Sequence, residues 1–206
     1  LARQLAGRLH YTYIDSGAMY RAITYYFLQQ QTNMSDNSAI TKALEQIKLH
    51  FVDNKIDLNG VAVELEIRTM QVSGQVSEVA AIGEVRSFAV AQQQLMGLEK
   101  GIVMDGRDIG TTVFPQAELK IFLTASEEIR AQRRFTEMLL KGQIVTINEV
   151  AHNLQHRDHI DSTRAISPLR KADDAVVLDN SYLSMSEQLD IAYRWALERA
   201  EDHLPA

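Results

Sequence analysis

Charged residues and a glycine follow an apolar run near the middle of this chain. The run "GIVM" ends at Met104 and is followed directly by Asp105, Gly106, Arg107 and Asp108. Such a run is typical of a buried strand, and Gly106 allows close approach of the backbone to a ligand. Arg107 offers a rigid fork of donors that suits phosphate, and Asp108 is a nearby acceptor. Ligands of open α/β sheets bind beyond the carboxyl ends of the strands, so we interpret this cluster as part of a binding site rather than as a surface ion pair.

A second apolar run, at residues 11–14, is followed by Asp15, Ser16 and Gly17 and then by a helical pattern that includes Arg21. A strand that passes directly into a helix presents unpaired backbone N–H groups at the helix start, which suits an anion. Arg21 lies within the first two turns and is placed to close over a phosphate. A capped helix with a surface arginine is the alternative interpretation of this motif.

A third cluster of charge lies in the second half of the chain. It begins at Arg133 and Arg134 and continues at Arg157, Asp158, Asp161 and Arg164. On a helix, spacings of four and then three residues place Arg157, Asp161 and Arg164 on one face. They either form a functional surface or a ladder of mutual ion pairs on a solvated helix.

Three histidines, His152, His156 and His159, raise the question of a metal site. His156 and His159 are close on a helix, but no third ligand has a suitable spacing and no His-Glu-x-x-His pattern occurs. We therefore predict no protein-bound metal.

The composition limits the possible partners. The 206 residues carry a net charge of −6 and include no cysteine. The negative balance and the scattered basic residues argue against nucleic acid as a partner. No apolar run approaches the ~20 residues that span a bilayer, so we predict no membrane contact. The lack of cysteine fits a reducing cytoplasm, where we place the protein, and we predict a monomer.

Strand-like and helical patterns alternate along most of the chain. Strands are predicted at 11–14, 102–105, 119–124 and 175–179, and helices at 19–31, 84–100, 126–141 and 184–198. The strand runs are continuously apolar, which is typical of strands buried on both faces of a parallel sheet. The fold class is therefore α/β, with a parallel sheet flanked by helices.

Two stretches depart from this alternation. Residues 49–65 alternate as short strands do, with turn signals at Asp53-Asn54 and Asn59-Gly60, and predict a small antiparallel insertion. Residues 141–171 are rich in charge and include the helix-like "TINEVAHNLQHRD", which we interpret as an irregular, mobile arm or lid. At the other end, Leu1, Leu5 and Leu9 share a helix face without an N-cap, so we expect the printed sequence to start partway through a helix.

Several segments, in order, resemble the bacterial cytidylate kinase family. They are "YIDSGAMYRA", "SGQVSEVAAIGEVR", "GIVMDGRDIGTTVFPQAELKIFLTAS", "RAQRR", "RD…DSTRAISPL" and "ADDAVVLDNSYLS". The resemblance covers almost the whole chain. It implies a P-loop nucleoside monophosphate kinase fold, with a core at 1–34, 87–132 and 166–206, a nucleotide-binding insertion at 35–86 and a helical lid at 133–165. It also implies transfer of the γ-phosphate of ATP, with Mg²⁺, to CMP or dCMP.

The resemblance implies a role for each matching residue. Ser16, Gly17, Arg21 and Arg107 resemble the group that binds the acceptor phosphate, and Ser77, Arg86 and Asp108 resemble the group that reads cytosine. Arg157 and Asp161 resemble the pair at the ribose, and Arg164 resembles a lid arginine that reaches phosphate. Arg133 and Arg134 resemble arginines near ATP. Arg107, Arg133 and Arg164 are the implied catalytic arginines.

Cytosine presents two acceptors and one amine donor along its pairing edge. An arginine such as Arg86 donates to the acceptors, while a carboxylate such as Asp108 accepts from the amine. Uracil carries a carbonyl oxygen in place of the amine and would face Asp108 lone pair against lone pair, which is a strong basis for discrimination.

Two departures from the family pattern stand out. Ile160 and Ser162 occupy positions where the family has arginine, so the predicted lid is less basic. The sequence also contains no Gly-x-x-x-x-Gly-Lys-[Ser/Thr] loop, which we expect just before Leu1 and which would cradle the donor phosphates. A chain truly without that loop should be inactive. The alternatives are therefore a kinase that also accepts UMP, or a nucleotide-binding protein without catalysis.

Overall fold

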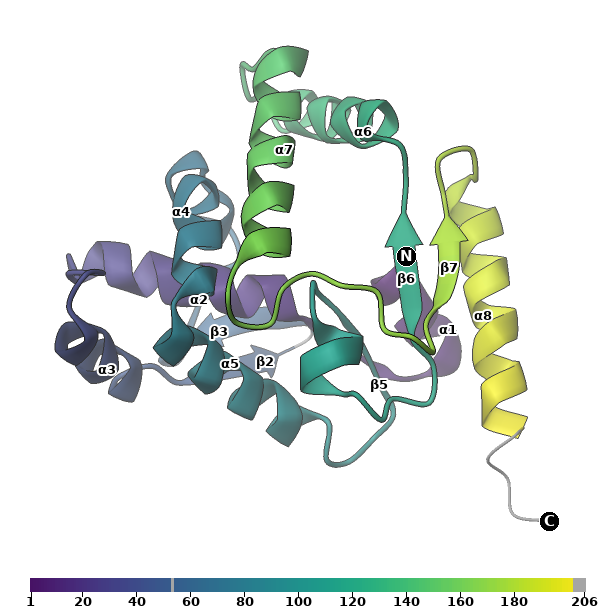
Figure 1. Ribbon diagram of the computed structural model, residues 1–206, viewed down its shortest axis with the longest axis horizontal. Coiled ribbons are helices and arrows are strands. Elements are labelled where there is room, and N and C mark those ends of the chain that lie inside the picture. Colours follow the sequence, from purple (N-terminus) through teal and green to yellow (C-terminus); the bar gives the residue numbers. More distant parts are fainter. Residues whose placement is uncertain (53, 202–206) are drawn as a thin grey trace.

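Two pairs of parallel strands carry the apolar runs of the sequence. In this computed structural model, which describes residues 1–52 and 54–201, β1 (Thr12–Asp15) pairs with β5 (Ile102–Asp105). Likewise β6 (Ile121–Thr124) pairs with β7 (Val176–Asp179) (Figure 1). All four predicted strands are confirmed, and so is their parallel direction.

The parallel strands are less buried than their continuous apolar sequence predicts. Leu123 of β6 is 46% exposed and Val177 of β7 is 52% exposed. Within the described residues each parallel sheet holds only two strands, so every one of them is an edge strand. The prediction of strands buried on both faces is therefore wrong for β6 and β7.

Five helices lie where the sequence predicts helical segments. They are α1 (Ala2–Leu9), α2 (Ser16–Gln29), α5 (Gly83–Met96), α6 (Glu127–Leu140) and α8 (Met185–Glu201). Asp15 caps α2 by accepting from the backbone N–H of Ala18 at 2.9 Å. Ser126 caps α6 as predicted, accepting from the N–H of Ile129 at 3.3 Å. The cap at Asp15 fixes the point where β1 turns into α2.

Four helical segments were not predicted as such. They are α3 (Asn37–Glu45), the short 3₁₀-helix η1 (Glu66–Arg68), α4 (Met70–Ala81) and the π-helix η2 (Ile109–Val113). In α4 the buried residues Val72, Val76 and Val79 are spaced by four and three, a helical signal that was present in the sequence. Valine has a low intrinsic helix propensity, and packing overrides it here.

The charged arm is more regular than predicted. Helix α7 (Ile147–Thr163) runs for 17 residues and starts with a reciprocal capping box between Thr146 and Glu149. It packs against α6 and α4, as Figure 1 also shows. The helix-like segment within this stretch is therefore confirmed as a helix, which local capping and packing against two helices stabilise, while the assignment of the stretch as a mobile lid stays a prediction.

The predicted antiparallel insertion is confirmed. Strands β2 (Leu49–Val52), β3 (Lys55–Leu58) and β4 (Val61–Ala62) form a three-stranded antiparallel sheet. Leu58 pairs with Val61, so Asn59 and Gly60 form a two-residue turn with φ angles of 55° and 84°. Asp53, part of the other predicted turn, lies outside the described residues.

The main hydrophobic core joins this insertion to α2. Met19, Ile23 and Phe27 of α2 are fully buried, and they belong to one cluster with Ile56 of β3 and Val79 of α4. Because α2 and α4 pack in the same core, the side chains near the start of α2 are held at fixed positions relative to those of α4.

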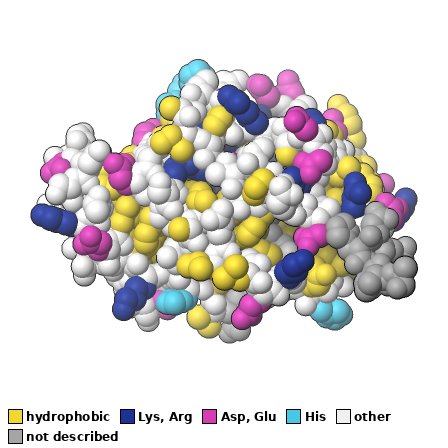
Figure 2. Space-filling model, turned by 60° about the horizontal axis from the view of Figure 1, so that its bottom comes forward, with side chains coloured by type: hydrophobic (Ala, Val, Ile, Leu, Met, Phe, Trp, Pro, Cys, Tyr) yellow, Lys and Arg dark blue, Asp and Glu magenta, His cyan; other side chains and the backbone are white. Residues whose placement is uncertain are grey.

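The surface does not concentrate charge of one sign on the face drawn in Figure 2, where basic and acidic side chains are interspersed. In the described part of the chain no helix has the length and apolar character needed to cross a bilayer.

The Asn59-Gly60 turn gives a stability prediction. Gly60→Ala places a Cβ at a φ of +84° and should lower the free energy of unfolding by about 1 kcal/mol. The matched control is Gly74→Ala in α4, where a Cβ meets open space, and which should raise the free energy of unfolding by about 0.5–1 kcal/mol. Urea denaturation of both variants measures the difference. Equal effects would contradict the strained-turn assignment.

Candidate active site

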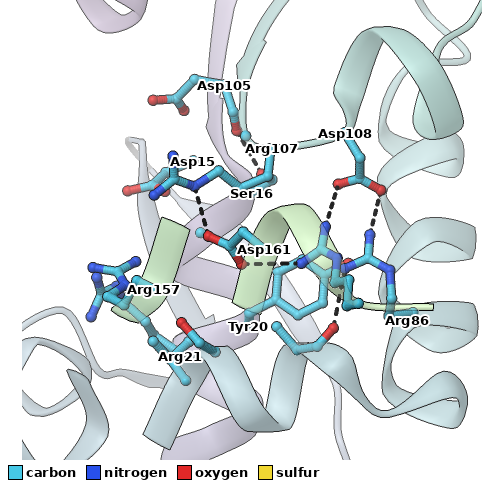
Figure 3. Close-up of a pocket in the computed structure, with 16 residues that line it drawn as sticks. Asp15, Ser16, Tyr20, Arg21, Arg86, Asp105, Arg107, Asp108, Arg157 and Asp161 are labelled. Carbon is cyan, nitrogen blue, oxygen red and sulfur yellow. Dashed lines mark hydrogen bonds and ion pairs between the residues drawn. The ribbon is translucent and has the colours of Figure 1, made fainter. Parts of the chain in front are cut away.

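A cleft opens where the carboxyl ends of β1 and β5 meet α2, α4, α5 and α7 (Figure 3). Its wall includes all ten residues for which the sequence predicts a substrate-binding role: Ser16, Gly17, Arg21, Ser77, Arg86, Arg107, Asp108, Arg157, Asp161 and Arg164. The fold therefore brings together three clusters that lie far apart in the sequence.

The two strand ends are tied together at the floor of the cleft. Register pairs Asp15 with Asp105, and the hydroxyl of Ser16 donates to the backbone carbonyl of Asp105 at 2.6 Å. Gly106 is required by this contact, because a Cβ there would lie 2.2 Å from the Ser16 oxygen. The start of α2 thus faces the cleft directly beside the loop that carries Arg107.

A buried ion pair forms one wall. Arg86 of α5 and Asp108 are bonded through their side chains, which are 2% and 5% exposed. Arg86 also donates to the backbone carbonyl of Ala80 at 3.2 Å, and its guanidinium lies 5.4 Å from the centre of the Tyr20 ring. The second oxygen of Asp108 lies 3.7 Å from Arg164. Asp108 therefore has one oxygen bonded and one that is close to a cation but beyond hydrogen-bond distance.

A second carboxylate, Asp161, links the lid helix to the β5 loop. It accepts a hydrogen bond from Arg164 at 3.3 Å and forms an ion pair with Nε of Arg107 at 3.0 Å. Because Arg164 also approaches Asp108, these residues form a chain of alternating charges that crosses the cleft (Figure 3). The predicted face of α7 exists, and it points into the cleft.

Arg21 and Arg157 lie on the other side of the cleft and have fewer acidic neighbours. Burial, and then the charges of Arg157, Arg68 and Arg134, lower the pKa of Arg21 to about 10. Its side chain donates to Ser73 at 3.0 Å. Burial and then the nearby Arg107 lower the pKa of Arg157, whose buried Nε has no hydrogen-bond partner in the part of the chain that the structure describes. Crowded cations of this kind favour an anion between them.

The structure does not bring Arg133 and Arg134 into the wall of this cleft. Arg133 of α6 donates to the side-chain and backbone oxygens of Asn180 at 2.9 and 2.7 Å. Arg134 pairs with Glu137 at 2.7 Å. Their assignment to ATP stays a prediction.

Six further residues border the cleft: Asp15, Tyr20, Val76, Ala80, Asp105 and Gly106. Asp15, Asp105 and Gly106 belong to the clusters that the sequence placed at strand ends, but they received no individual binding role; Tyr20, Val76 and Ala80 were missed. Tyr20 was assigned to core packing, and it is only 7% exposed, yet its position four residues after Ser16 places it on the same face of α2. Burial raises the pKa of Tyr20, whose hydroxyl has no hydrogen-bond partner among the described residues.

Within residues 1–52 and 54–201, no three His, Asp or Glu side chains are grouped so that they could hold a metal ion.

A sequence profile described as cytidylate kinase matches residues 1–196 of the chain. The chain belongs to the cytidylate kinase family. A cytidylate kinase of Flavobacterium psychrophilum is 54% identical over 200 residues, which cover 93% of this chain and 88% of that protein. A cytidylate kinase of Bacteroides fragilis is 53% identical over 197 residues, which cover 91% of this chain and 86% of that protein. The cytidylate kinase family and its P-loop kinase type of α/β fold, as inferred from the sequence, are confirmed.

The buried pair of this cytidylate kinase family member gives a second stability prediction. Asp108→Asn leaves the charge of Arg86 buried without its carboxylate and should lower the free energy of unfolding by about 3 kcal/mol. The same change at Asp174, a 65% exposed partner of Lys120, should lower it by less than about 1 kcal/mol. Chemical denaturation of both variants compares them. A similar loss in the two proteins would refute the special contribution of the buried pair.

Proposed function

We propose that this protein transfers the γ-phosphate of ATP to CMP or dCMP, and that the cleft at the ends of β1 and β5 binds the acceptor nucleotide. The observation that carries this proposal is the division of the cleft into two parts. One part holds the buried Arg86–Asp108 pair, and the other holds Arg21 and Arg157, whose charges crowd one another. A nucleotide has a matching polarity, with a neutral base at one end and a phosphate at the other.

The base is proposed to bind at Arg86, Asp108 and Ser77. The oxygen of Asp108 that is not bonded to Arg86 has its acceptor capacity available for the amine of cytosine. Arg86 would donate to the ring acceptors, and its Nε has no hydrogen-bond partner among the described residues. The hydroxyl of Ser77, on the buried side of α4, lies within the same wall.

The acceptor phosphate is proposed to bind at the start of α2. Backbone N–H groups near Ser16 and Gly17 and the side chains of Arg21 and Arg107 would surround it. Burial and then the charges of neighbouring arginines lower the pKa of Arg21, and a phosphate there would offset those charges. Arg157 and Asp161 are proposed to contact the ribose.

Phosphoryl transfer depends mainly on position and on charge stabilisation. Arg107, Arg133 and Arg164 are the proposed catalytic arginines, and Arg133 and Arg134 the proposed contacts to ATP. Residues 133–165 act as the lid, 35–86 as the acceptor-binding insertion and the remaining residues as the core. We assign the protein to the cytoplasm as a monomer.

Mg²⁺ is proposed to arrive as a complex with ATP, because Mg²⁺ in such sites is held by one or two carboxylates and the substrate phosphates. It would neutralise charge on the donor phosphates.

Two other functions were considered. A kinase of broader specificity would accept UMP equally, which conflicts with a buried carboxylate at the base. A protein that binds nucleotides without catalysis is the second, since the 206 residues contain no Gly-x-x-x-x-Gly-Lys-[Ser/Thr] loop. The family membership favours the kinase.

A coupled assay of ADP release tests the function directly. The full-length gene product is given ATP and Mg²⁺ with CMP, dCMP, UMP or AMP in turn. We expect CMP and dCMP to be used at least about 100-fold more efficiently than UMP, because uracil opposes its carbonyl to Asp108. A kcat/KM for UMP equal to that for CMP would contradict the proposed role of Asp108 in reading cytosine, but not the kinase activity. No turnover with any acceptor would favour the binding protein.

A further inference from the structure

Asp158 lies just outside the cleft, one turn before Asp161 on α7. One of its oxygens is 3.5 Å from Nη2 of Arg107, and the other is paired with Arg130 of α6. Its side chain is 25% exposed, and it does not border the cleft itself. Asp158 therefore connects three segments: the loop after β5, helix α6 and helix α7.

Arg107 is held along one edge by two carboxylates. Its Nε contacts Asp161 at 3.0 Å and its Nη2 faces Asp158 at 3.5 Å. In the described part of the chain neither contact uses Nη1. Since a guanidinium is planar and rigid, fixing one edge also fixes the direction of the remaining donors.

The two holds on Arg107 differ in strength. Both contacts are ion pairs, and the one to Asp161 is shorter, at 3.0 Å against 3.5 Å for Asp158. Among the described residues the Asp158 oxygen that faces Arg107 has no hydrogen-bond partner, so its attraction to Arg107 is electrostatic. Arg130 holds Asp158 from its other oxygen, so α6 sets the orientation of the carboxylate.

We propose that Asp158 is a positioning residue for the acceptor phosphate, which it serves by orienting Arg107. This inference rests on the proposed function of Arg107 in phosphate binding. The Arg107–Asp158 pair is partly exposed, so its contribution to stability is small, and its effect is on the geometry of Arg107. Asp158 touches neither the base nor the ribose in this arrangement.

The opposite role is physically distinct. If Asp158 competed with the phosphate for Arg107, its removal would strengthen binding of CMP. If Asp158 only held α7 against α6, its removal would weaken binding of every ligand of the cleft equally. The proposal predicts a loss that depends on the phosphate of the ligand.

The test compares CMP with cytidine, which lacks the phosphate. Calorimetry on the full-length protein gives Kd for both ligands, and steady-state kinetics give KM and kcat. For Asp158→Asn we expect a Kd for CMP raised about tenfold, a Kd for cytidine changed by less than about twofold, and a higher KM for CMP at nearly unchanged KM for ATP. Asp158→Glu should restore at least half of the CMP affinity on a logarithmic scale.

Two further variants complete the design. Arg130→Gln removes the ion pair between α6 and Asp158 but keeps Asp158 itself. It should raise the Kd for CMP about threefold and, like Asp158→Asn, leave the Kd for cytidine nearly unchanged. It keeps the test valid if Asp158→Asn does not fold. Asp174→Asn is the matched control. Asp174 is paired with Lys120 just before the start of β7, and its substitution should leave the Kd of CMP and of cytidine unchanged.

The possible results separate the two proposals. Equal weakening of CMP and cytidine, unchanged CMP binding, or tighter CMP binding in Asp158→Asn would overturn the role of Asp158. A wild-type protein that binds CMP but does not phosphorylate it would overturn the proposed function alone, since the binding comparison does not need turnover.

Discussion

The buried ion pair between Arg86 and Asp108 is the interaction on which the arrangement of the cleft depends. Two charges removed from water destabilise the protein unless each is satisfied by its neighbours. That requirement connects the segment after β5 to α5 through the pair itself, and to the end of α4 through the bond from Arg86 to the carbonyl of Ala80. Arg164, approaching from the end of α7, adds a fourth segment. A site at the mouth of β5 is thus fixed from several sides.

The same core determines where the other charges lie. Helix α2 packs with α4 and with the small antiparallel sheet in one hydrophobic cluster. The backbone positions of Arg21 and Ser77 are therefore fixed by that cluster. Ser16 then joins the start of α2 to the end of β5 through the carbonyl of Asp105. Gly106 makes this approach possible. Dense packing on one side and a single backbone contact on the other place the helix start beside Arg107.

Much of this was predictable because strand ends converge. Charges that directly follow two apolar runs meet when the runs pair in parallel, and the spacing of Arg157, Asp161 and Arg164 gives one helix face. The exposure of β6 was not predictable, since it depends on which strands lie beside it. Helix α4 was missed because valine is a poor helix former. Asp158 belonged to a predicted charged cluster but received no role of its own, because its contacts, Arg107 and Arg130, come from two other segments, and sequence spacing does not report such contacts.

The proposed orientation of the bound nucleotide follows from which arginines lie beside carboxylates and which do not. Arg86 and Arg164 have carboxylates beside them, so in that part of the cleft the positive charge is balanced and a neutral base is accommodated. Arg21 and Arg157 lie near further arginines; burial and then these charges lower the pKa of each. Arg107 lies between the two parts and forms ion pairs with Asp161 and Asp158. A ligand that carries charge at one end only is therefore bound in one direction, and the arginine at the boundary is the one whose orientation needs control.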